Sequence, residues 1–225
     1  MLRTTRSTVL AAVAALIASG LFIENTSADL IIPAGVQQNV PVSTVTDVWG
    51  WNLAYQGSYG DFDVPIDDLF AGVEAGGYVM YAAKPTGSST ITLLAAAEES
   101  DVRTVTSGNS TTTSNGAEWY YNGLSIGFAG LGDTINQLSA DVNSSNADLR
   151  LSWHTDGIGG NSDGVAPINV DGGWRVGATT SLNNSTSFER LVFVASAVPE
   201  PSSLLILGIG MATLAARRRR TPVGT

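Results

Sequence analysis

The chain contains few of the side chains that carry out catalysis, so the first question is whether any of them are arranged for chemistry. Cysteine is absent from all 225 residues, which removes thiolate nucleophiles, iron–sulfur clusters and cysteine zinc sites. His154 is the single histidine, so any Ser-His-Asp triad must use it, and no Gly-x-Ser-x-Gly turn is present to carry the serine. We therefore expect His154 to be a surface residue, and we expect no enzymatic activity.

Two acidic segments contain oxygen ligands of the kind that calcium prefers. Asp61 and Asp63 alternate along the chain, so both carboxylates share a face, as a calcium site or a glycosidase pair requires. Asp156 and Asp163 lie in a glycine-rich loop, which lacks the alternating acids and closing glutamate of an EF-hand. The competing interpretations are a solvated acidic surface and a flexible turn. We expect no required cofactor, and calcium is the one candidate.

Aromatic side chains suggest a different chemistry, the binding of sugars. Trp49 and Trp51 are close together early in the chain, and Trp119 and Tyr121 lie on either side of Tyr120. Exposed aromatic rings stack on the apolar faces of sugar rings, and alternate residues of a strand share a face. Trp119 and Tyr121 therefore point the same way, either into the core or toward a glycan.

The elements that position these residues are expected to be strands. Runs of β-prone residues alternate with turn clusters such as Asn115-Gly116, which predicts an all-β fold, a jelly-roll-like or related antiparallel β-sandwich. The expected strands are residues 43–54, 77–83, 90–96, 102–106, 117–121, 125–129, 149–154, 173–176 and 188–195. Short helices are expected at 66–71 and 133–138. The run 191–194 is apolar on both faces, which is typical of a sandwiched strand.

The expected strand 149–154 has a different pattern, with one apolar and one polar face. Leu151 and Trp153 point to one side, and Arg150, Ser152 and His154 point to the other. This alternation predicts a half-buried strand whose polar face meets solvent.

The charge of the central region excludes one class of partner. Residues 29–198 hold 18 acidic and five basic side chains, which gives a net charge of −13. Phosphate backbones and anionic lipid surfaces are repelled by such a domain. We therefore expect no nucleic-acid partner.

The first 28 residues have the composition of a secretory signal peptide. Arg3 and Arg6 precede an uncharged, mostly apolar run at 7–23, and a polar exit with small side chains ends at Ala28. This run is short for a membrane span, which needs about 20 apolar residues. We expect signal peptidase to cut after Ala28, leaving an all-β extracellular domain at 29–197.

The last segment combines three parts in a fixed order. Pro199, Glu200 and Pro201 form an extended segment, because proline has no backbone N–H and cannot continue a strand ladder. Residues 204–216 are 13 uncharged, mainly apolar residues that can form a short hydrophobic helix. A terminal basic cluster then keeps the far end on the cytoplasmic side; it consists of Arg217, Arg218, Arg219 and Arg220.

This order resembles the PEP-CTERM family of sorting signals, and the resemblance covers about residues 198–220. We therefore assign 198–225 as a sorting tail. The resemblance implies that exosortase, a membrane transpeptidase-like enzyme of Gram-negative bacteria that make extracellular polysaccharide, recognises and cuts the tail. An ordinary C-terminal anchor is the alternative, although 13 apolar residues are short for a span.

The resemblance also implies a location and a set of partners. The protein is expected at the cell envelope, on the outer surface or in the extracellular matrix, after transient anchoring in the inner membrane through its C-terminal helix. Signal peptidase, exosortase and extracellular polysaccharide are the expected partners. For the domain itself we expect a non-enzymatic structural or adhesive role. The alternatives are a calcium-assisted carbohydrate-binding module and, with least support from the residues, a secreted hydrolase.

Overall fold

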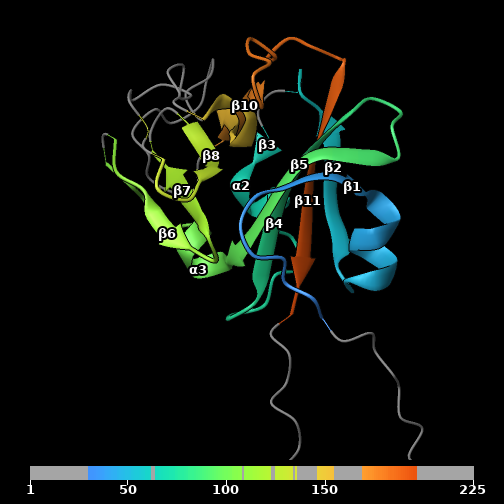
Figure 1. Ribbon diagram of the computed structural model, residues 1–225, viewed down its shortest axis with the longest axis vertical. Helices are drawn as coiled ribbons and strands as arrows, with labels where there is room; N and C mark the ends of the chain where they lie inside the picture. The colour runs from blue at the N-terminus through green and yellow to red at the C-terminus, as the bar shows by residue number, and fades with distance from the viewer. Residues whose placement is uncertain are drawn as a thin grey trace, which may run out of the picture.

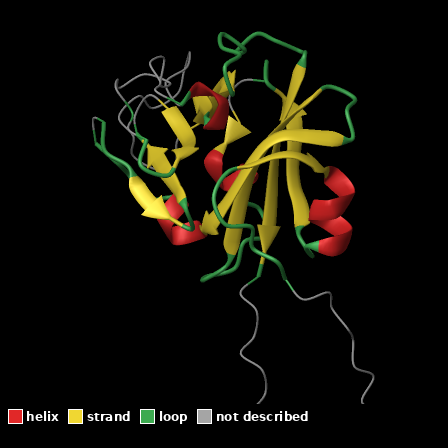
Figure 2. Cartoon of the chain, in the orientation of Figure 1, coloured by secondary structure: helices red, strands yellow, loops and turns green. Residues whose placement is uncertain are grey.

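A computed structural model describes residues 30–61, 64–107, 109–122, 125–133, 135, 146–154 and 169–196. These residues form two antiparallel sheets with a shared hydrophobic core, and short helical turns lie at the periphery (Figure 1, Figure 2). The predicted all-β antiparallel sandwich is confirmed. The expected signal peptide and sorting tail lie outside the described residues, as do four of the six residues of the helix expected at 133–138.

The first sheet has five strands in the order β1-β5-β4-β11-β2. Its members are β1 (Gln37–Pro41), β2 (Asn52–Ser58), β4 (Tyr78–Pro85), β5 (Thr90–Glu98) and β11 (Phe188–Ala195). Strand β11 pairs with β4 along its whole length, from Phe188 opposite Pro85 to Ala195 opposite Tyr78, and with β2 on its other side. The last strand of the domain is therefore held on both edges.

The second sheet has six strands in the order β3-β10-β9-β8-β7-β6. Its members are β3 (Val64–Pro65), β6 (Thr112–Ser114), β7 (Ala117–Tyr121), β8 (Ser125–Gly130), β9 (Leu151–His154) and β10 (Asn169–Val176). Strands β6 to β10 are neighbours in chain order, so they form an up-and-down meander. Asn115 and Gly116 join β6 to β7 with φ of 45° and 77°, the positive values that a tight hairpin turn needs.

Four helical turns complete the described fold: η1 (Thr44–Val48), a π-helix; α2 (Ile66–Leu69); α3 (Glu99–Val102); and η2 (Ala147–Leu149), a 3₁₀ turn. The helix expected after Pro65 is present as α2, although it is shorter than the predicted 66–71.

Two predicted strands are partly or wholly wrong. The first half of 43–54 forms η1, in which Val45 is the buried residue, and the strand begins only at Asn52. The segment 102–106 starts in the last residue of α3 and continues as a turn. The Arg103 N–H donates to the Glu99 carbonyl at 2.9 Å and the two side chains form an ion pair, so a helical turn replaces extended backbone there.

The main core lies between the sheets and is rich in aromatic rings. Tyr81 of β4 has its ring centroid 4.7 Å from that of Trp153 on β9 and 5.6 Å from that of Trp119 on β7. Trp119 in turn meets Phe128 of β8 edge-on at 5.6 Å. Pairs of this kind add about 0.5–1.5 kcal/mol each to the stabilisation from burial alone. These contacts join β4 of one sheet to three strands of the other.

A second apolar cluster covers the outer face of the five-stranded sheet. Leu191 and Phe193 of β11 point into it, whereas Val192 and Val194 belong to the core between the sheets. The predicted sandwiched strand at 191–194 is therefore confirmed. The outer cluster is closed by residues from η1 and the N-terminal segment, including Val45, Trp51 and Leu30.

The polar side chains of the predicted strand 149–154 are not solvent-exposed, contrary to the prediction. The strand itself, β9, begins only at Leu151, because Leu149 lies in η2 and Arg150 follows it. Arg150 and Ser152 are 0% exposed, and His154 is partly buried. Gly127 of β8 lies between Tyr120 and Ser152 in register, and the Tyr120 hydroxyl donates to the Leu151 carbonyl at 3.2 Å. A Cβ on Gly127 would lie 2.0 Å from the same Leu151 carbonyl oxygen, so this close arrangement requires glycine at position 127.

The two ends of the described chain lie at the same end of the sandwich (Figure 1). Leu30 begins the described residues and Ser196 ends them, one position after β11. Within these residues, none of the helices is both long and apolar enough to span a bilayer.

Candidate functional site

The point at which the tail leaves the domain is fixed by β11. Ala195 is 4% exposed and pairs with Tyr78. If Gly77 had a side chain, its Cβ would lie only 2.9 Å from the carbonyl oxygen of Ala195. Only glycine therefore allows the backbone of β11 to approach this turn so closely. Pro199 follows Ala195 by four residues, which span at most about 14 Å. Any enzyme that reads the tail at Pro199 must come close to this end of the sandwich.

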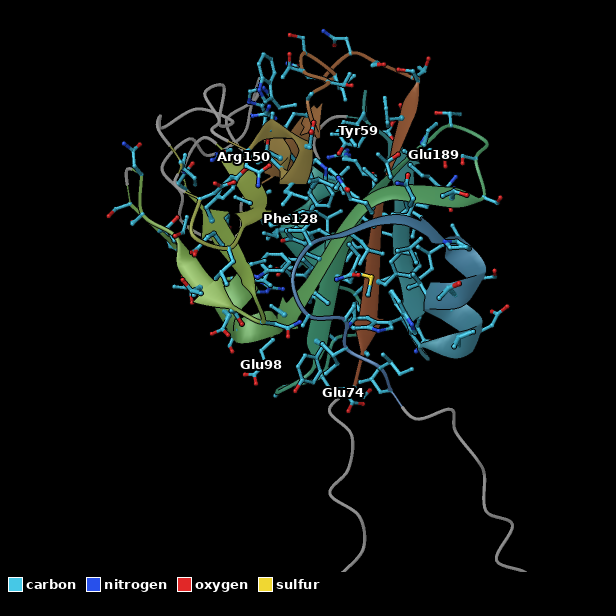
Figure 3. All side chains as sticks on the ribbon, in the orientation of Figure 1. Tyr59, Glu74, Glu98, Phe128, Arg150 and Glu189 are labelled. Carbon is cyan, nitrogen blue, oxygen red and sulfur yellow. The ribbon has the colours of Figure 1, made fainter. Side chains whose placement is uncertain are left out.

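The surface around the exit is acidic. Glu74 and Glu98 are both exposed, and Figure 3 shows both at the end of the molecule where β11 finishes. Glu98 lies opposite Tyr78, the residue that also pairs with Ala195. The Glu98 carboxylate is therefore two strands away from the last residue of β11. The sorting residues themselves lie outside the described residues; they are Pro199, Glu200, Pro201, Arg217, Arg218, Arg219 and Arg220, together with Ala28 at the other terminus.

The aromatic residues considered for sugar binding are mostly in the core. Trp51, Trp119 and Tyr121 are at most 2% exposed, and partly buried Trp49 packs against the outer apolar cluster. The Trp51 indole donates to the carbonyl of Ile31 at 2.8 Å. Burial also raises the pKa of Tyr121 to about 12. The rings of Trp51, Trp119 and Tyr121 therefore offer no exposed face on which a sugar can stack.

Asp61, one of the calcium candidates, is committed to the turn that follows β2. Its carboxylate accepts a hydrogen bond from the Ser58 N–H at 2.7 Å, and its carbonyl accepts from the Gly172 N–H at 2.9 Å. Asp63, Asp156 and Asp163 lie outside the described residues, so the structure does not place the calcium candidates relative to one another. In the described parts of the chain, no group of three aspartate, glutamate or histidine side chains is arranged to hold a metal ion.

A buried arginine beside Asp61 was not identified from the sequence. Arg190 is 0% exposed, and its guanidinium donates to the carbonyls of Asp61 at 2.8 Å and Ser58 at 3.3 Å. Burial lowers the pKa of Arg190, and nearby Tyr55, Tyr59 and Asp61 oppose that effect. The alternation of side chains along the strand could have predicted its burial. Arg190 lies on the same face as Val192 and Val194, which point into the interior.

A pocket of about 350 Å³ lies on the outer face of the five-stranded sheet, at the end where β11 begins. It is lined by Gln56, Gly57, Ser58, Thr86, Thr186 and Glu189. Figure 3 shows Glu189 at the end of the molecule opposite Glu74. None of these residues was singled out in the sequence, because they come from two strands and two loops whose neighbours are known only from the fold.

The polar groups of the pocket are held in place by one another. The Glu189 carboxylate accepts hydrogen bonds from the Gln56 amide at 3.1 Å and from the Lys84 ammonium, with which it forms an ion pair. The Lys84 side chain is 8% exposed and that of Glu189 is 18% exposed. The Thr86 hydroxyl donates to the Thr186 carbonyl at 2.6 Å. The pocket thus presents a carboxylate, an amide and hydroxyl groups in a fixed arrangement.

Comparison with known protein families matches residues 197–220 to the PEP-CTERM protein-sorting motif. The resemblance drawn from the Pro-Glu-Pro segment, the apolar stretch and the arginine cluster is therefore confirmed. The motif is that of an exported, envelope-sorted protein processed by exosortase. The match covers the tail and not the β-sandwich. No curated protein and no solved structure is significantly similar to the chain.

Proposed function

We propose that this chain is a non-enzymatic structural or adhesive protein, which exosortase releases from the inner membrane to the outer surface or extracellular matrix of a Gram-negative-type bacterium. The observation that carries the proposal is the junction between the sorting motif and the sandwich. The motif begins at residue 197, two positions after β11 ends at Ala195. The tail is thus attached to a strand held on both edges, and not to a loose extension of the fold.

This junction restricts where processing can occur. Strand β11 contributes Leu191 and Phe193 to the outer cluster and Val192 and Val194 to the core between the sheets. A cut within β11 would remove residues of these clusters and shorten the strand that β2 and β4 share. We therefore expect exosortase to cut beyond Ala195, so that the released domain keeps its whole sandwich.

The other terminus fits removal of a signal peptide. Leu30 and Ile32 pack against the outer cluster, and the Ile31 N–H donates to the Trp49 carbonyl at 3.0 Å. The domain therefore uses residues from position 30 onward. A cut by signal peptidase after Ala28 leaves these contacts intact.

Charge supports an orientation in which the exit end faces the membrane without adhering to it. Leu204, where the apolar stretch begins, follows Ala195 by nine residues, so a linker of at most about 32 Å keeps this end near the membrane while the stretch is inserted. Exposed Glu74 and Glu98 are repelled by anionic lipid headgroups, whereas the arginine cluster favours the cytoplasmic side. The repulsion favours a separation between this end of the domain and the lipid surface, which leaves room for the enzyme.

The single histidine has a structural environment, which supports the non-enzymatic part of the proposal. The His154 ring is partly buried and lies edge-on to Trp174 with centroids 5.3 Å apart. Its register partners on the two neighbouring strands are Ser125, which is 0% exposed, and Asp171. The ring contact with Trp174 supports a packing role for His154.

The test is mass spectrometry of the mature protein from the native host, together with cell fractionation. Wild-type protein should end between residue 196 and the start of the apolar stretch, outside the inner membrane. Glu200→Ala should leave the uncut chain in the inner membrane, because the substitution removes the central residue of the motif. Asp68→Ala, at an exposed carboxylate of α2, is the control and should be processed normally.

Replacing the four arginines with serine should give a different defect. Without the basic cluster, the positive-inside preference is lost, and uncut chains should reach the periplasm. If wild-type protein at its final location still contains residues 202–225, the tail acts as a simple anchor and the proposal fails.

A further inference from the structure

The pocket at the start of β11 contains hydrogen-bonding groups of both kinds. Glu189 can only accept, the Gln56 amide can donate and accept, and the Thr186 hydroxyl can do either. The hydroxyls of Ser58 and Thr86 donate to the carbonyls of Ser185 and Thr186, which leaves their oxygens to accept from a ligand. A ligand that satisfies this mixture must itself carry several groups that both donate and accept. The volume of about 350 Å³ is at the small end of the range for ligand pockets, which suits a single ring with its substituents.

The charges of the pocket select among such ligands. Lys84 is largely buried next to Glu189 and pairs with it, so a cation entering the pocket gains little net attraction. An anion entering the pocket meets the Glu189 carboxylate, which is the more exposed member of the pair, and is repelled by it. The net charge of −13 of the domain adds to this repulsion. Desolvating either kind of ion would therefore not be compensated. A neutral ligand with many hydroxyl groups avoids both penalties.

We propose that this pocket binds one neutral saccharide unit through hydrogen bonds, without a metal ion. Gln56 and Glu189, which are hydrogen-bonded to each other, contact hydroxyls of the sugar, and the oxygens of Thr86 and Ser58 accept from further hydroxyls. No aromatic ring lines the pocket, so the affinity comes from polar contacts and lies in the weak range typical of single sugars. Repeated along a polymer, such contacts add up to firm attachment.

The position of the pocket makes this binding compatible with membrane tethering. Glu189 and Ala195 are six residues apart on one extended strand, which corresponds to about 20 Å. The pocket therefore opens at the end of the sandwich away from the tail exit (Figure 3). The inference is independent of the sorting proposal, because it concerns the folded domain before and after the tail is cut.

The test is saturation-transfer-difference NMR and amide chemical-shift titration of the full-length chain in a mild detergent. The probes are D-glucose, D-galactose and D-mannose, with D-glucuronate and D-glucosamine as charged counterparts. At least one neutral sugar should bind, with shifts at the pocket residues, and both charged counterparts should bind more weakly. Addition of EDTA should leave the affinity unchanged. Binding that requires calcium, or tighter binding of a charged sugar than of every neutral one, would overturn the proposal.

Variants locate the binding to the pocket. Gln56→Ala removes an exposed amide and should weaken binding about three- to tenfold, the usual effect of one net hydrogen bond. Thr86→Val keeps the shape of the side chain and should also weaken binding. Gln38→Ala, an exposed glutamine of β1 at the far edge of the sheet, is the matched control and should bind like wild type. Unchanged affinity in both pocket variants, or no binding of any neutral sugar by wild type, would refute the inference.

Discussion

Removing the carboxylate of Glu118 should weaken the fold by an amount that depends on pH. Glu118 lies on β7 and is 6% exposed. Its Oε2 accepts hydrogen bonds from the hydroxyls of Thr111 and Thr113, both at 2.8 Å, and its Oε1 accepts from the Gly132 N–H at 3.0 Å. The side chain thus ties β6, at the edge of its sheet, and the turn after β8 to the strand between them. The same three hydrogen bonds determine its ionisation. Burial raises the pKa of Glu118, but the hydrogen bonds from the three donors have the larger effect, so the pKa is lowered from 4.5.

The size of the effect follows from these contacts. A hydrogen bond to a charged group contributes about 1.5–3 kcal/mol to the free energy of unfolding. Thr113 and Gly132 are exposed and can bind water once the carboxylate is gone, which reduces the loss. We therefore expect Glu118→Ala to destabilise the domain by about 2–3 kcal/mol. For a protein of this size, that lowers the melting temperature by about 4–12 °C. Glu118→Gln keeps the shape and should cost about 1 kcal/mol at neutral pH.

The pH dependence follows from the direction of the pKa shift. A carboxyl group whose folded-state pKa is lowered stabilises the fold fully above its ordinary pKa of 4.5, and this contribution is lost as the pH falls through the folded value. Urea unfolding should therefore show a stability gap between wild type and Glu118→Gln that is largest at neutral pH and shrinks toward about pH 3. Glu74→Gln, at an exposed glutamate, is the control and should behave like wild type at neutral pH. A gap that stays constant across this range would refute the reasoning.

Three further predictions concern single residues. Asn115→Ala should lower the free energy of unfolding in urea by about 2–4 kcal/mol, because it removes two amide hydrogen bonds of 2.8 Å to the carbonyls of Pro33 and Ala96 and places alanine at a positive φ. Asn115→Gly loses the same hydrogen bonds but tolerates that φ, and it should lose about half as much. Ultraviolet titration should show that Tyr121, whose pKa burial raises to about 12, stays neutral above the ordinary value of 10.0, and the domain should lose stability above that pH because the unfolded chain ionises first. His154→Ala should cost about 1 kcal/mol, since its ring packs on a tryptophan, and a change below about 0.5 kcal/mol would indicate a surface residue after all.

Much of the fold was predictable because alternation and turn chemistry agree locally. The strands at 117–121 and 188–195 have the predicted bounds. In the first, the Asn115-Gly116 turn fixes where the strand must begin, since few other residue pairs adopt its two positive φ angles. In the second, continuous apolar residues require burial on both faces, and the sheet provides it. Local sequence therefore predicts a strand correctly where the turn residues and the pattern of buried residues favour the same structure.

The prediction of a strand at 43–48 was wrong because a tertiary contact, and not the local sequence, determines the structure of this segment. The outer face of the five-stranded sheet carries apolar residues such as Met80 and Phe193, and something must cover them. The helical turn η1 does so with Val45. A β-branched residue has a strand preference on its own, and only the tertiary contact overrides it.

The candidate pocket could not be predicted from the sequence for a related reason. Gln56, Lys84 and Glu189 are far apart in sequence and meet only because β11 lies between β2 and β4. The same holds for the buried polar face of β9, where the close arrangement of Tyr120 and Leu151 requires glycine at position 127 on the strand between them. Period two tells which residues share a face, but the identity of the neighbouring strand decides whether that face is buried.

The register of one strand connects the pocket, the buried arginine and the tail exit. Along β11, Glu189 faces the outer pocket, Arg190 faces the interior, and Ala195 ends the strand opposite Tyr78. A slip of one residue would exchange the two faces, placing a carboxylate in the core and a guanidinium in the pocket. It would also bring the Pro-Glu-Pro segment one position closer to the sandwich or one further away. The interior hydrogen bonds from Arg190 to Asp61 and Ser58 oppose such a slip, because they form only when residue 190 points inward. The buried guanidinium therefore opposes a slip that would change both the pocket at one end of β11 and the distance between fold and sorting signal at the other.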